Sequence, residues 1–257
     1  MKCAGKKVLI TGCNRGMGRG FALEAEKRGA HLILHARKWT EESKKGFLYP
    51  ERHDFIDADL SKSDDLEKLI HASHDVDILI NNAGVLTGDL IENQSFEEIE
   101  MVMNINSLVP MKLCQALIPS MLKKSQALIV NNTSVSAIMR FPLASTYAAS
   151  KSALAAFSEC LSNELDGTPI KVLVLYTPGI ATDMFTDVCK RYGKNLDMGL
   201  MTSIPIEKYA SRVLDAIENG KTVLNPSGSS AVGLFLARYI PWLFNFFIKK
   251  MYKRSLK

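Results

Sequence analysis

Short apolar runs alternate along the chain with longer stretches that mix apolar and polar residues. Short runs rich in Val, Ile and Leu are typical of buried strands. The predicted strands are Lys7–Thr11, His31–Arg37, His53–Leu60, Val76–Ile80, Ala127–Ser134, Ile170–Tyr176 and Lys221–Leu224. Helices are predicted for Phe21–Gly29, Asp64–His71, residues 95–124, and the stretches around Tyr147 and Tyr209. This alternation indicates an α/β fold with a doubly wound parallel sheet.

The long helical stretch 95–124 contains Pro110 and Pro119, which are expected to bend or break it. The chain has 257 residues, 47% of them hydrophobic and 23% charged, which suits one large α/β domain or two small ones. We expect one domain over residues 1–228, followed by a hydrophobic and basic C-terminal extension over residues 229–257.

The net charge of +5 comes largely from the last nine residues, which include Lys249, Lys250, Lys253, Arg254 and Lys257. Such a basic tail is not a nucleic-acid-binding face, so no nucleic-acid partner is expected. The five cysteines are scattered, without a C-x-x-C pair or a neighbouring His cluster. We therefore expect no disulfide framework and no metal site, and reduced thiols in the cytoplasm. The first strand begins almost at once and leaves no room for a signal peptide.

A glycine-rich turn, Gly12-Cys13-Asn14-Arg15-Gly16-Met17-Gly18, separates the first strand from the first helix. Glycine lets the backbone approach a pyrophosphate, and the N–H groups at a helix N-terminus favour an anion. A glycine turn between a strand and a helix therefore indicates a Rossmann-type dinucleotide site, in preference to a plain βα turn.

The end of the second strand bears on which dinucleotide binds. An NAD site tends to place Asp or Glu there, where it bonds the ribose 2′-hydroxyl. This chain has Ala36-Arg37-Lys38 instead, and Arg15 lies in the glycine turn. Guanidinium groups suit a 2′-phosphate, which they can bind by bidentate hydrogen bonds. We therefore expect NADP(H); the alternative is that Arg37 is merely solvated.

Polar and small residues follow the next two strands. Asp59 could accept a hydrogen bond from an adenine amino group, or it could be an ordinary cap or turn residue. Asn81-Asn82-Ala83-Gly84 follows the fourth strand. Small and amide residues at this edge of a parallel sheet fit a ligand crevice.

Tyr147 and Lys151 are four residues apart in a predicted helix, so their side chains share one face. A phenol has a pKa of about 10, and an ammonium one turn away favours the phenolate and lowers that pKa. The pair is a candidate acid/base unit. An ordinary helix would explain Y-x-x-x-K on its own; the accompanying motifs favour the chemical interpretation.

Together these motifs resemble the classical short-chain dehydrogenase/reductase family. The resemblance runs from about Lys7 to Met184 and includes the helix around Tyr209. It rests on T-G-x-x-x-G-x-G at Thr11–Gly18, Asp59-Leu60, N-N-A-G at Asn81–Gly84, Asn106, Ser134, Y-x-x-x-K at Tyr147–Lys151, and Pro178-Gly179 with Thr182. Ser134 precedes Tyr147 by thirteen residues, as the family pattern asks.

The resemblance implies catalytic roles. Tyr147 would be the general acid in carbonyl reduction or the base in alcohol oxidation. Lys151 would bond the nicotinamide ribose and lower the pKa of Tyr147. Ser134 would hydrogen-bond the substrate oxygen. Asn106 would hold a water in a proton relay to Lys151, with Asn104 as the fallback.

The resemblance also implies the cofactor contacts. They would come from Gly12, Asn14, Arg15, Gly16, Met17, Gly18, Arg37, Asp59, Leu60, Asn82, Ala83, Gly84, Tyr147, Lys151, Pro178, Gly179, Ile180 and Thr182. Thr182 and the Ile180 backbone would contact the carboxamide. The stretch from Pro178 to Thr182 departs from the family here, because it is one residue shorter than the usual P-G-x-x-x-T.

Two segments fall outside the family motifs. Residues 231–248 are apolar but contain Arg238 and Pro241, which makes a poor membrane-spanning helix. Packing on the core, a lid over a greasy substrate, a dimer contact and a helix in a membrane interface all stay open. Residues 183–203 contain Met184, Met198, Met201 and two glycines, and predict either a substrate-closing loop or a variable surface loop.

We therefore expect an NADP(H)-dependent oxidoreductase that transfers hydride between nicotinamide and a carbonyl or secondary alcohol, with a lipophilic small-molecule substrate. The resemblance implies a homodimer or homotetramer through the helices of Asn106 and Tyr147. The protein would be cytoplasmic, with peripheral membrane contact through the extension as an option. The rival is a non-catalytic NADP-binding sensor or membrane-associated scaffold, which the presence of Asn106, Ser134, Tyr147 and Lys151 disfavours.

Overall fold

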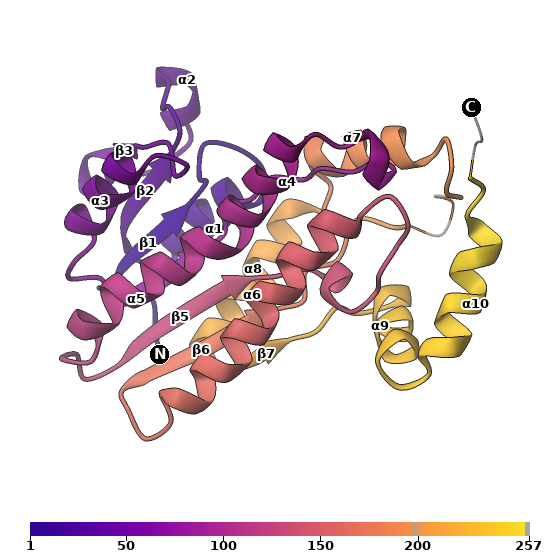
Figure 1. Ribbon diagram of the computed structural model, residues 1–257. Coiled ribbons are helices and arrows are strands. Elements are labelled where there is room, and N and C mark those ends of the chain that lie inside the picture. The colour runs from indigo at the N-terminus through magenta and orange to yellow at the C-terminus, as the bar shows by residue number, and fades with distance from the viewer. Residues whose placement is uncertain (198, 200, 255–257) are drawn as a thin grey trace.

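Apolar runs along the chain pair into one parallel sheet. The computed structural model describes residues 1–197, 199 and 201–254 (Figure 1). The strands are β1 (Lys7–Thr11), β2 (His31–Ala36), β3 (Asp54–Asp57), β4 (Ile78–Asn81), β5 (Ala127–Asn132), β6 (Ile170–Leu175) and β7 (Val223–Leu224). Their order is β3-β2-β1-β4-β5-β6-β7, and every neighbouring pair is parallel. The predicted doubly wound α/β fold is thus confirmed.

Helices cover both faces of this sheet. The α-helices in the described part of the chain are α1 (Gly16–Lys27), α2 (Glu41–Lys44), α3 (Ser63–Ala72), α4 (Phe96–Met103), α5 (Val109–Met121), α6 (Ser145–Glu164), α7 (Asp183–Tyr192), α8 (Ile206–Glu218), α9 (Ser229–Tyr239) and α10 (Pro241–Met251). The short turns are η1 (Pro50–Arg52), η2 (Ile91–Asn93), η3 (Asn104–Leu108) and η4 (Val135–Ala137). Figure 1 looks onto the layer that contains α5 and α6, with α8 beyond the sheet.

The strands divide the core into two apolar layers because alternate side chains point to opposite faces. Val8 and Ile10 pack with α1 and α8, whereas Leu9 between them packs with α3, α5 and α6. Both faces are therefore buried, as is usual for a parallel sheet. The carboxyl ends of all the strands meet at one edge.

The first helix begins earlier than the sequence predicted. It starts at Gly16, not Phe21, so Gly16, Met17 and Gly18 form its first turn. The predicted glycine cap at its end is present. Gly29 has a φ of 78°, its N–H donates to Glu26 O, and the Ala30 N–H donates to Ala25 O. These bonds form a Schellman motif.

The long helical stretch runs from Phe96 to Met121 without a break. A π-helical turn, η3, joins α4 to α5, and Pro110 lies directly after it in the first turn of α5. A proline is tolerated there because the π-helical turn interrupts the regular i→i−4 hydrogen-bond ladder just before it. The expectation that Pro110 or Pro119 would break the helix was therefore wrong, and a bend at these prolines stays a prediction. By length and composition alone, Phe96–Met121 is the one described helix that could cross a membrane, and 44% of its most apolar 18-residue window is buried in the domain.

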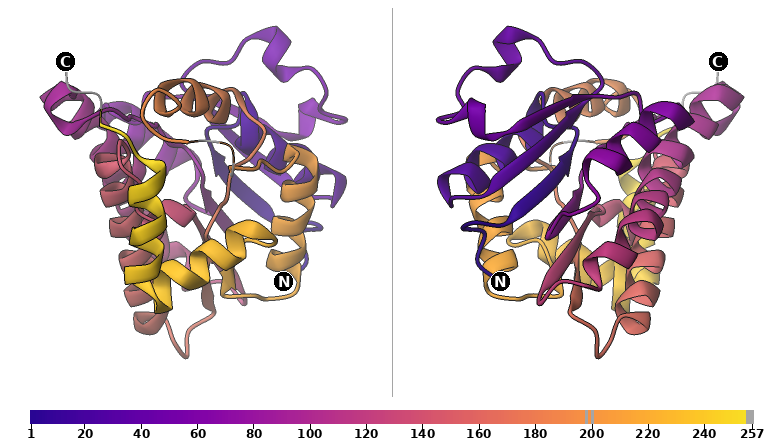
Figure 2. Two further views of the ribbon diagram at one scale, coloured as in Figure 1. Left: turned by 90° about the vertical axis from the view of Figure 1, so that its right-hand side faces the viewer. Right: turned by 90° about the vertical axis from the view of Figure 1, so that its left-hand side faces the viewer.

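The C-terminal extension folds as two helices, α9 and α10, at the end of the molecule farthest from α2 (Figures 1 and 2). Leu234 packs with Ala137 and Tyr176, and the ring of Phe244 lies 5.8 Å from that of Phe141. Packing on the domain is thus observed. The division of the chain at residue 228 stays a prediction, although α9 begins at Ser229.

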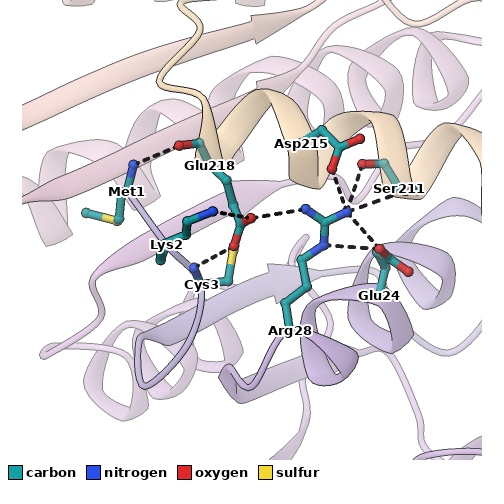
Figure 3. Close-up of polar contacts among 8 residues, drawn as sticks. All are labelled: Met1, Lys2, Cys3, Glu24, Arg28, Ser211, Asp215 and Glu218. Atoms are coloured by element: carbon teal, nitrogen blue, oxygen red, sulfur yellow. Dashed lines mark hydrogen bonds and ion pairs between the residues drawn. The ribbon is translucent and has the colours of Figure 1, made fainter.

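An ionic network joins α1 to α8 and the N-terminal residues (Figure 3). The Arg28 guanidinium lies 2.8 Å from Glu24 Oε1, 2.8 Å from Asp215 Oδ1 and 3.4 Å from Glu218 Oε2. Glu218 in turn accepts the backbone N–H of Cys3. The Arg28 side chain is only 16% exposed, so its loss would leave three carboxylates together without their shared cation.

We predict that Arg28→Met lowers the free energy of unfolding by about 1–3 kcal/mol, because the partners of a half-buried cation lose their compensation. Urea denaturation followed by circular dichroism measures the change. Lys27→Met is the matched control, since Lys27 is exposed on the same helix and should change stability by less than about 0.5 kcal/mol. Equal stabilities of the two variants would contradict the prediction.

Candidate active site

Polar side chains at the carboxyl ends of adjacent strands hydrogen-bond to one another. Thr11 Oγ1 at the end of β1 accepts the backbone N–H groups of Asn82 and Ala83, both at 2.9 Å. Asn82 Nδ2 donates to Thr11 O at 2.8 Å, and Asn82 Oδ1 accepts Asn132 Nδ2 at 3.0 Å. Thr177 Oγ1 donates to Asn132 Oδ1 at 2.5 Å. The backbone and side chain of Asn82 therefore connect the ends of β1, β4 and β5, and the amide group is occupied by these hydrogen bonds.

The glycine turn fits a pyrophosphate. Gly12 and Gly16 have positive φ angles of 73° and 57°. A Cβ on Gly18 would lie 2.0 Å from Gly12 O, so only glycine at position 18 lets the first turn of α1 pack against Gly12. No side chain caps α1, and its first turn carries no acidic residue. Its first N–H groups therefore remain for an anion, as a dinucleotide site requires.

His35 fixes the position of this turn, which sequence reasoning missed. The Gly12 N–H donates to His35 Nδ1 at 3.2 Å, and His35 Nε2 lies 2.9 Å from Ala58 O. The Cys13 N–H donates to the His35 carbonyl. Burial lowers the pKa of His35, which keeps the ring neutral, with Nδ1 accepting and Nε2–H donating. A second His, inside the apolar strand that His31 begins, was the available signal.

Arg15 and Arg37, the two residues predicted to bind a 2′-phosphate, lie on the protein surface next to the glycine turn. Arg15 is the N-terminal flanking residue of α1, Arg37 directly follows β2, and both are exposed. The bond from Cys13 to His35 brings the turn alongside the end of β2. Neither guanidinium has a hydrogen-bond or ion-pair partner in the described part of the chain. Asn14 and Met17 are half-buried in the same turn.

Asp59 and Leu60 follow β3. Asp59 Oδ1 accepts both the N–H and the hydroxyl of Ser61, at 3.0 and 2.7 Å. These two bonds, more than the charge of Arg37, hold the pKa of Asp59 below its usual value. The turn role of Asp59 is thus observed, and its contact with adenine stays a prediction. The Leu60 side chain is buried in the core, so only its backbone is available to a cofactor.

Ser134, Tyr147 and Lys151 converge at the ends of β5 and α6. Lys151 is only 5% exposed, and its Nζ donates to Asn132 O at 2.8 Å. The same Nζ lies 6.0 Å from the centre of the Tyr147 ring. Ser134 is buried, and its Oγ accepts the Ser136 N–H. Three of the four predicted catalytic side chains therefore lie close together.

Burial dominates the proton affinities of this group. It raises the pKa of Tyr147 above 10, with the Ser134 hydroxyl acting in the opposite direction. It also lowers the pKa of Lys151 to about 8. The sequence predicted that Lys151 would lower the pKa of Tyr147; in the protein, burial outweighs any such effect. The Tyr147 phenol therefore holds its proton at neutral pH.

Asn106 lies in the π-helical turn η3 and is completely buried. Its Nδ2 donates to Val85 O at 2.9 Å and Ser150 Oγ at 3.0 Å, and its Oδ1 accepts the Val85 N–H at 2.9 Å. A Cβ on Gly84 would lie 3.2 Å from that Oδ1 and 3.7 Å from Lys151 Nζ. The Asn106 side chain thus fixes the segment beside Lys151, and its part in a water relay stays a prediction.

The segment after β6 lies beside the glycine turn. Thr182 caps α7 by accepting the Phe185 N–H, and its Cγ2 would be 3.7 Å from a Cβ on Gly16. Ile180 pairs with Ile204, and the Gly179 carbonyl accepts the Ile204 N–H. The shortened turn from Pro178 therefore still carries Thr182 to the glycine turn.

Residues 183–192 form the helix α7, so the prediction of a loop over residues 183–203 was wrong for this part. Met198 lies outside the described residues. Tyr192 lies beside the start of α6: its hydroxyl donates to Thr87 O at 3.5 Å, and Thr87 Oγ1 lies 3.1 Å from Oγ1 of Thr146, the residue before Tyr147. Burial is the main cause that raises the pKa of Tyr192. We call the surrounding apolar residues the α7 cluster: Leu143, Ala144, Val188, Tyr192 and Leu196, with Leu86, Leu90, Phe141, Met201, Met251 and Tyr252 partly buried against them. The spacing of Val188 and Tyr192 was the missed helical signal.

The family model for short chain dehydrogenases matches residues 6–193. The chain belongs to this family. The match confirms the resemblance inferred from the motifs, and it makes the protein an oxidoreductase that binds a nicotinamide cofactor and acts on a small molecule. In the described part of the chain, no group of three or more His, Cys, Asp or Glu side chains could hold a metal ion.

Similar short chain dehydrogenases cover most of this chain. The 11-beta-hydroxysteroid dehydrogenase-like 3 of Arabidopsis thaliana is 35% identical over 233 residues, which span 86% of this chain and 73% of that protein. Ketoacyl reductase HetN of Nostoc sp. is 29% identical over 244 residues, 91% of this chain and 84% of that protein. A solved short chain dehydrogenase of Burkholderia cenocepacia in complex with NADP has a TM-score of 0.81 at 22% identity, covering 96% and 98% of the two chains, a likeness of fold alone.

We predict that Lys151→Met abolishes turnover yet raises the free energy of unfolding at pH 7 by about 1–3 kcal/mol, because an ammonium with a pKa of about 8 is costly to bury. Thermal unfolding of the cofactor-free protein measures the change. Between pH 8 and the ordinary lysine pKa the unfolded chain binds more protons, so the wild type gains stability with rising pH and the gap should narrow. A variant less stable than the wild type at pH 7, with Lys27→Met unchanged, would contradict this.

Proposed function

We propose that this short chain dehydrogenase is an NADP(H)-dependent enzyme that interconverts a carbonyl and a secondary alcohol on a lipophilic substrate. The observation that carries the proposal is the convergence of Tyr147, Lys151 and Ser134 beside a glycine turn suited to pyrophosphate. The acid/base pair and the cofactor cradle lie along the same edge of the sheet. An oxidoreductase needs both within reach of one substrate.

Each side chain of the group has a chemical task. Tyr147 donates its proton to the carbonyl oxygen during reduction and takes it back during oxidation. Ser134 hydrogen-bonds that oxygen and stabilises the charge that develops on it. Lys151 holds a positive charge near Tyr147 and is oriented by the Asn132 carbonyl. Asn106 fixes the segment at Val85 and supports a proton relay to Lys151.

The chain's own residues also explain how a nicotinamide dinucleotide would be held. When bound, the cofactor supplies or accepts the hydride. The first turn of α1, from Gly16 to Gly18, would bind its pyrophosphate. Asp59 and the Leu60 backbone would contact the adenine, and Ala83 and Gly84 would line the crevice. Lys151, Ile180 and Thr182 would hold the nicotinamide end.

The proposed preference for NADP(H) rests on the positive charges of Arg15 and Arg37 beside the glycine turn. Arg15 and Arg37 are exposed and unpaired among the described residues, and Ala36 stands where an acidic residue would oppose a 2′-phosphate. Two guanidinium groups there favour the extra phosphate through charge-assisted hydrogen bonds.

The lipophilic substrate is supported by the α7 cluster, because its members Leu143 and Ala144 directly precede α6, the helix that carries Tyr147. An apolar wall beside the acid/base pair favours a substrate with a large apolar body. The names of two similar proteins, a hydroxysteroid dehydrogenase-like protein and a ketoacyl reductase, agree with this class. A homodimer or homotetramer in the cytoplasm, formed through α5 and α6, completes the proposal.

We predict that the protein binds NADPH at least about tenfold more tightly than NADH, since each charge-assisted hydrogen bond contributes about 1.5–3 kcal/mol. Fluorescence titration with both cofactors measures this. Arg37→Asp should remove the preference, because it repels the 2′-phosphate and offers the ribose a carboxylate. Arg52→Asp makes the same charge change at another exposed site and should leave the preference intact. Tighter NADH binding by the wild type would overturn the NADP assignment.

We predict that Tyr147→Phe lowers turnover about 10²–10⁴-fold and leaves NADPH affinity nearly unchanged, because the variant loses only the proton donor. Steady-state reduction of a panel of lipophilic ketones and aldehydes measures this. Tyr239→Phe removes an exposed hydroxyl from the extension and serves as the control. The non-catalytic scaffold would be favoured if the wild type bound NADPH but turned over none of the panel.

A further inference from the structure

The helices of the extension expose apolar side chains on the side that faces away from the domain. Trp242 is 72% exposed, although tryptophan is rarely left so open on a protein surface. We call its group the aromatic face: Val232, Phe235, Tyr239, Trp242, Phe246 and Phe247, all of them exposed. The rings of Phe235 and Tyr239 lie 5.0 Å apart, and those of Phe246 and Phe247 lie 5.7 Å apart. Single exposed apolar residues need no explanation, whereas a group of this size on two adjoining helices marks a binding surface.

Both helices are apolar on their inner sides as well. Phe244 and Ile248 are buried at a spacing of four residues, and Leu234 is buried on α9. Val232, Phe235 and Tyr239 recur on the opposite side of α9, at the spacing of one helix face. A helix that is apolar on both sides is normally covered on both sides. The inner sides of α9 and α10 pack on the domain, whereas the apolar residues on their outer sides are exposed to solvent.

Charge identifies the kind of partner. Residues 219–257 contain no Asp or Glu, but they contain the bases Lys221, Arg238, Lys249, Lys250, Lys253, Arg254 and Lys257. Lys257 lies outside the described residues. Lys249, Lys250 and Lys253 are exposed, and no ion pair joins them to a carboxylate in the described part of the chain. Lys250 lies over the ring of Phe246, 4.4 Å from its centre, so cation and aromatic surface are adjacent.

A groove beside the aromatic face carries further positive charge. It lies between α6 and α10, has a volume of about 640 Å³, and is lined by Arg140 and Lys249 among apolar neighbours such as Phe141 and Ile248. Two cations on different elements therefore border apolar surface at the same end of the molecule. An acidic headgroup above an apolar layer matches this pattern.

We propose that the aromatic face docks on the surface of an anionic phospholipid bilayer. Aromatic rings enter the boundary between headgroups and acyl chains, and lysines beside them pair with acidic headgroups. A second copy of this chain is a poorer occupant. A two-fold dimer through this face would set the same unpaired lysines against each other.

The docked helices are also tied to the candidate substrate side. After α10, the chain returns to the segment that follows α7. The Asp197 N–H donates to Met251 O at 3.0 Å, and the Lys253 N–H donates to Asn195 O at 2.7 Å. Arg254 pairs with Glu92 on η2. Docking would therefore hold the α7 cluster near the bilayer, where a lipophilic substrate is concentrated.

The test uses the full chain and vesicles of phosphatidylcholine with or without about 30% phosphatidylserine. Trp242 is a built-in reporter, because the other tryptophan, Trp39, is only 7% exposed. We expect co-flotation with the acidic vesicles, a blue shift of the emission and protection from acrylamide. Binding should weaken when salt rises from about 0.1 M to about 0.5 M. Neutral vesicles should bind at least about tenfold more weakly.

Matched variants separate the contribution of the aromatic rings to vesicle binding from that of the lysine charges. Trp242→Ser with Phe246→Ser, and separately Lys249→Glu with Lys250→Glu, should each lower binding to acidic vesicles at least about tenfold. Phe96→Ser removes a phenylalanine that is 83% exposed on α4 and should leave binding unchanged. Retained NADPH binding and circular dichroism would show that the variants fold. Tyr147→Phe should bind vesicles like the wild type, so failure of the catalytic proposal would not affect this result.

Two results would overturn the proposal. One is the absence of both co-flotation and an emission shift with acidic vesicles. The other is protection of Trp242 from acrylamide without vesicles, together with dissociation of a dimer by Trp242→Ser in sedimentation velocity. That outcome would assign the aromatic face to a second copy of the chain.

Discussion

The site depends on hydrogen bonds between polar side chains at the carboxyl ends of the strands. Thr11, Asn82, Asn132 and Thr177 connect β1, β4, β5 and the segment after β6, and Thr177 continues to the hydroxyl of Tyr209 on α8. The Asn132 carbonyl is the hydrogen-bond acceptor for Lys151. A buried ammonium is stable only if its surroundings are fixed and polar. The same chain of amides and hydroxyls therefore sets both the width of the crevice and the position of its cation.

The elements that the sequence predicted best are those determined by local pattern. The run Val8-Leu9-Ile10 must be a buried strand in almost any fold, and Gly29 ends a helix because it tolerates a positive φ. The ordered motifs from Thr11 to Thr182 also identified the family before any contact was known. Tyr147, Lys151 and Ser134 were predictable for the same reason, because their spacing along the chain defines the motif.

The features that sequence reasoning missed depend on tertiary contacts. Gly16 and Gly18 disfavour a helix by propensity, yet both lie in the first turn of α1. Gly18 is needed there because the Cβ of any other residue would collide with the Gly12 carbonyl, a tertiary contact that the sequence alone does not reveal. The burial that raises the pKa of Tyr147 is a property of the assembled protein, so the four-residue spacing to Lys151 could not predict the net direction of the shift. Likewise, α7 is stabilised by packing on Leu143 and on the chain end near Met251, far away in the sequence.

The two edges of the sheet have a consequence for self-association. β7 is only two residues long, and β3 is four residues long with an aspartate at each end. Short or charged edge strands offer little backbone for another chain to pair with. Growth of the sheet by strand addition, the first step toward fibrils, is therefore disfavoured at both ends. Any assembly of this protein is left to its helical surfaces, which can close into discrete oligomers instead of extending without limit.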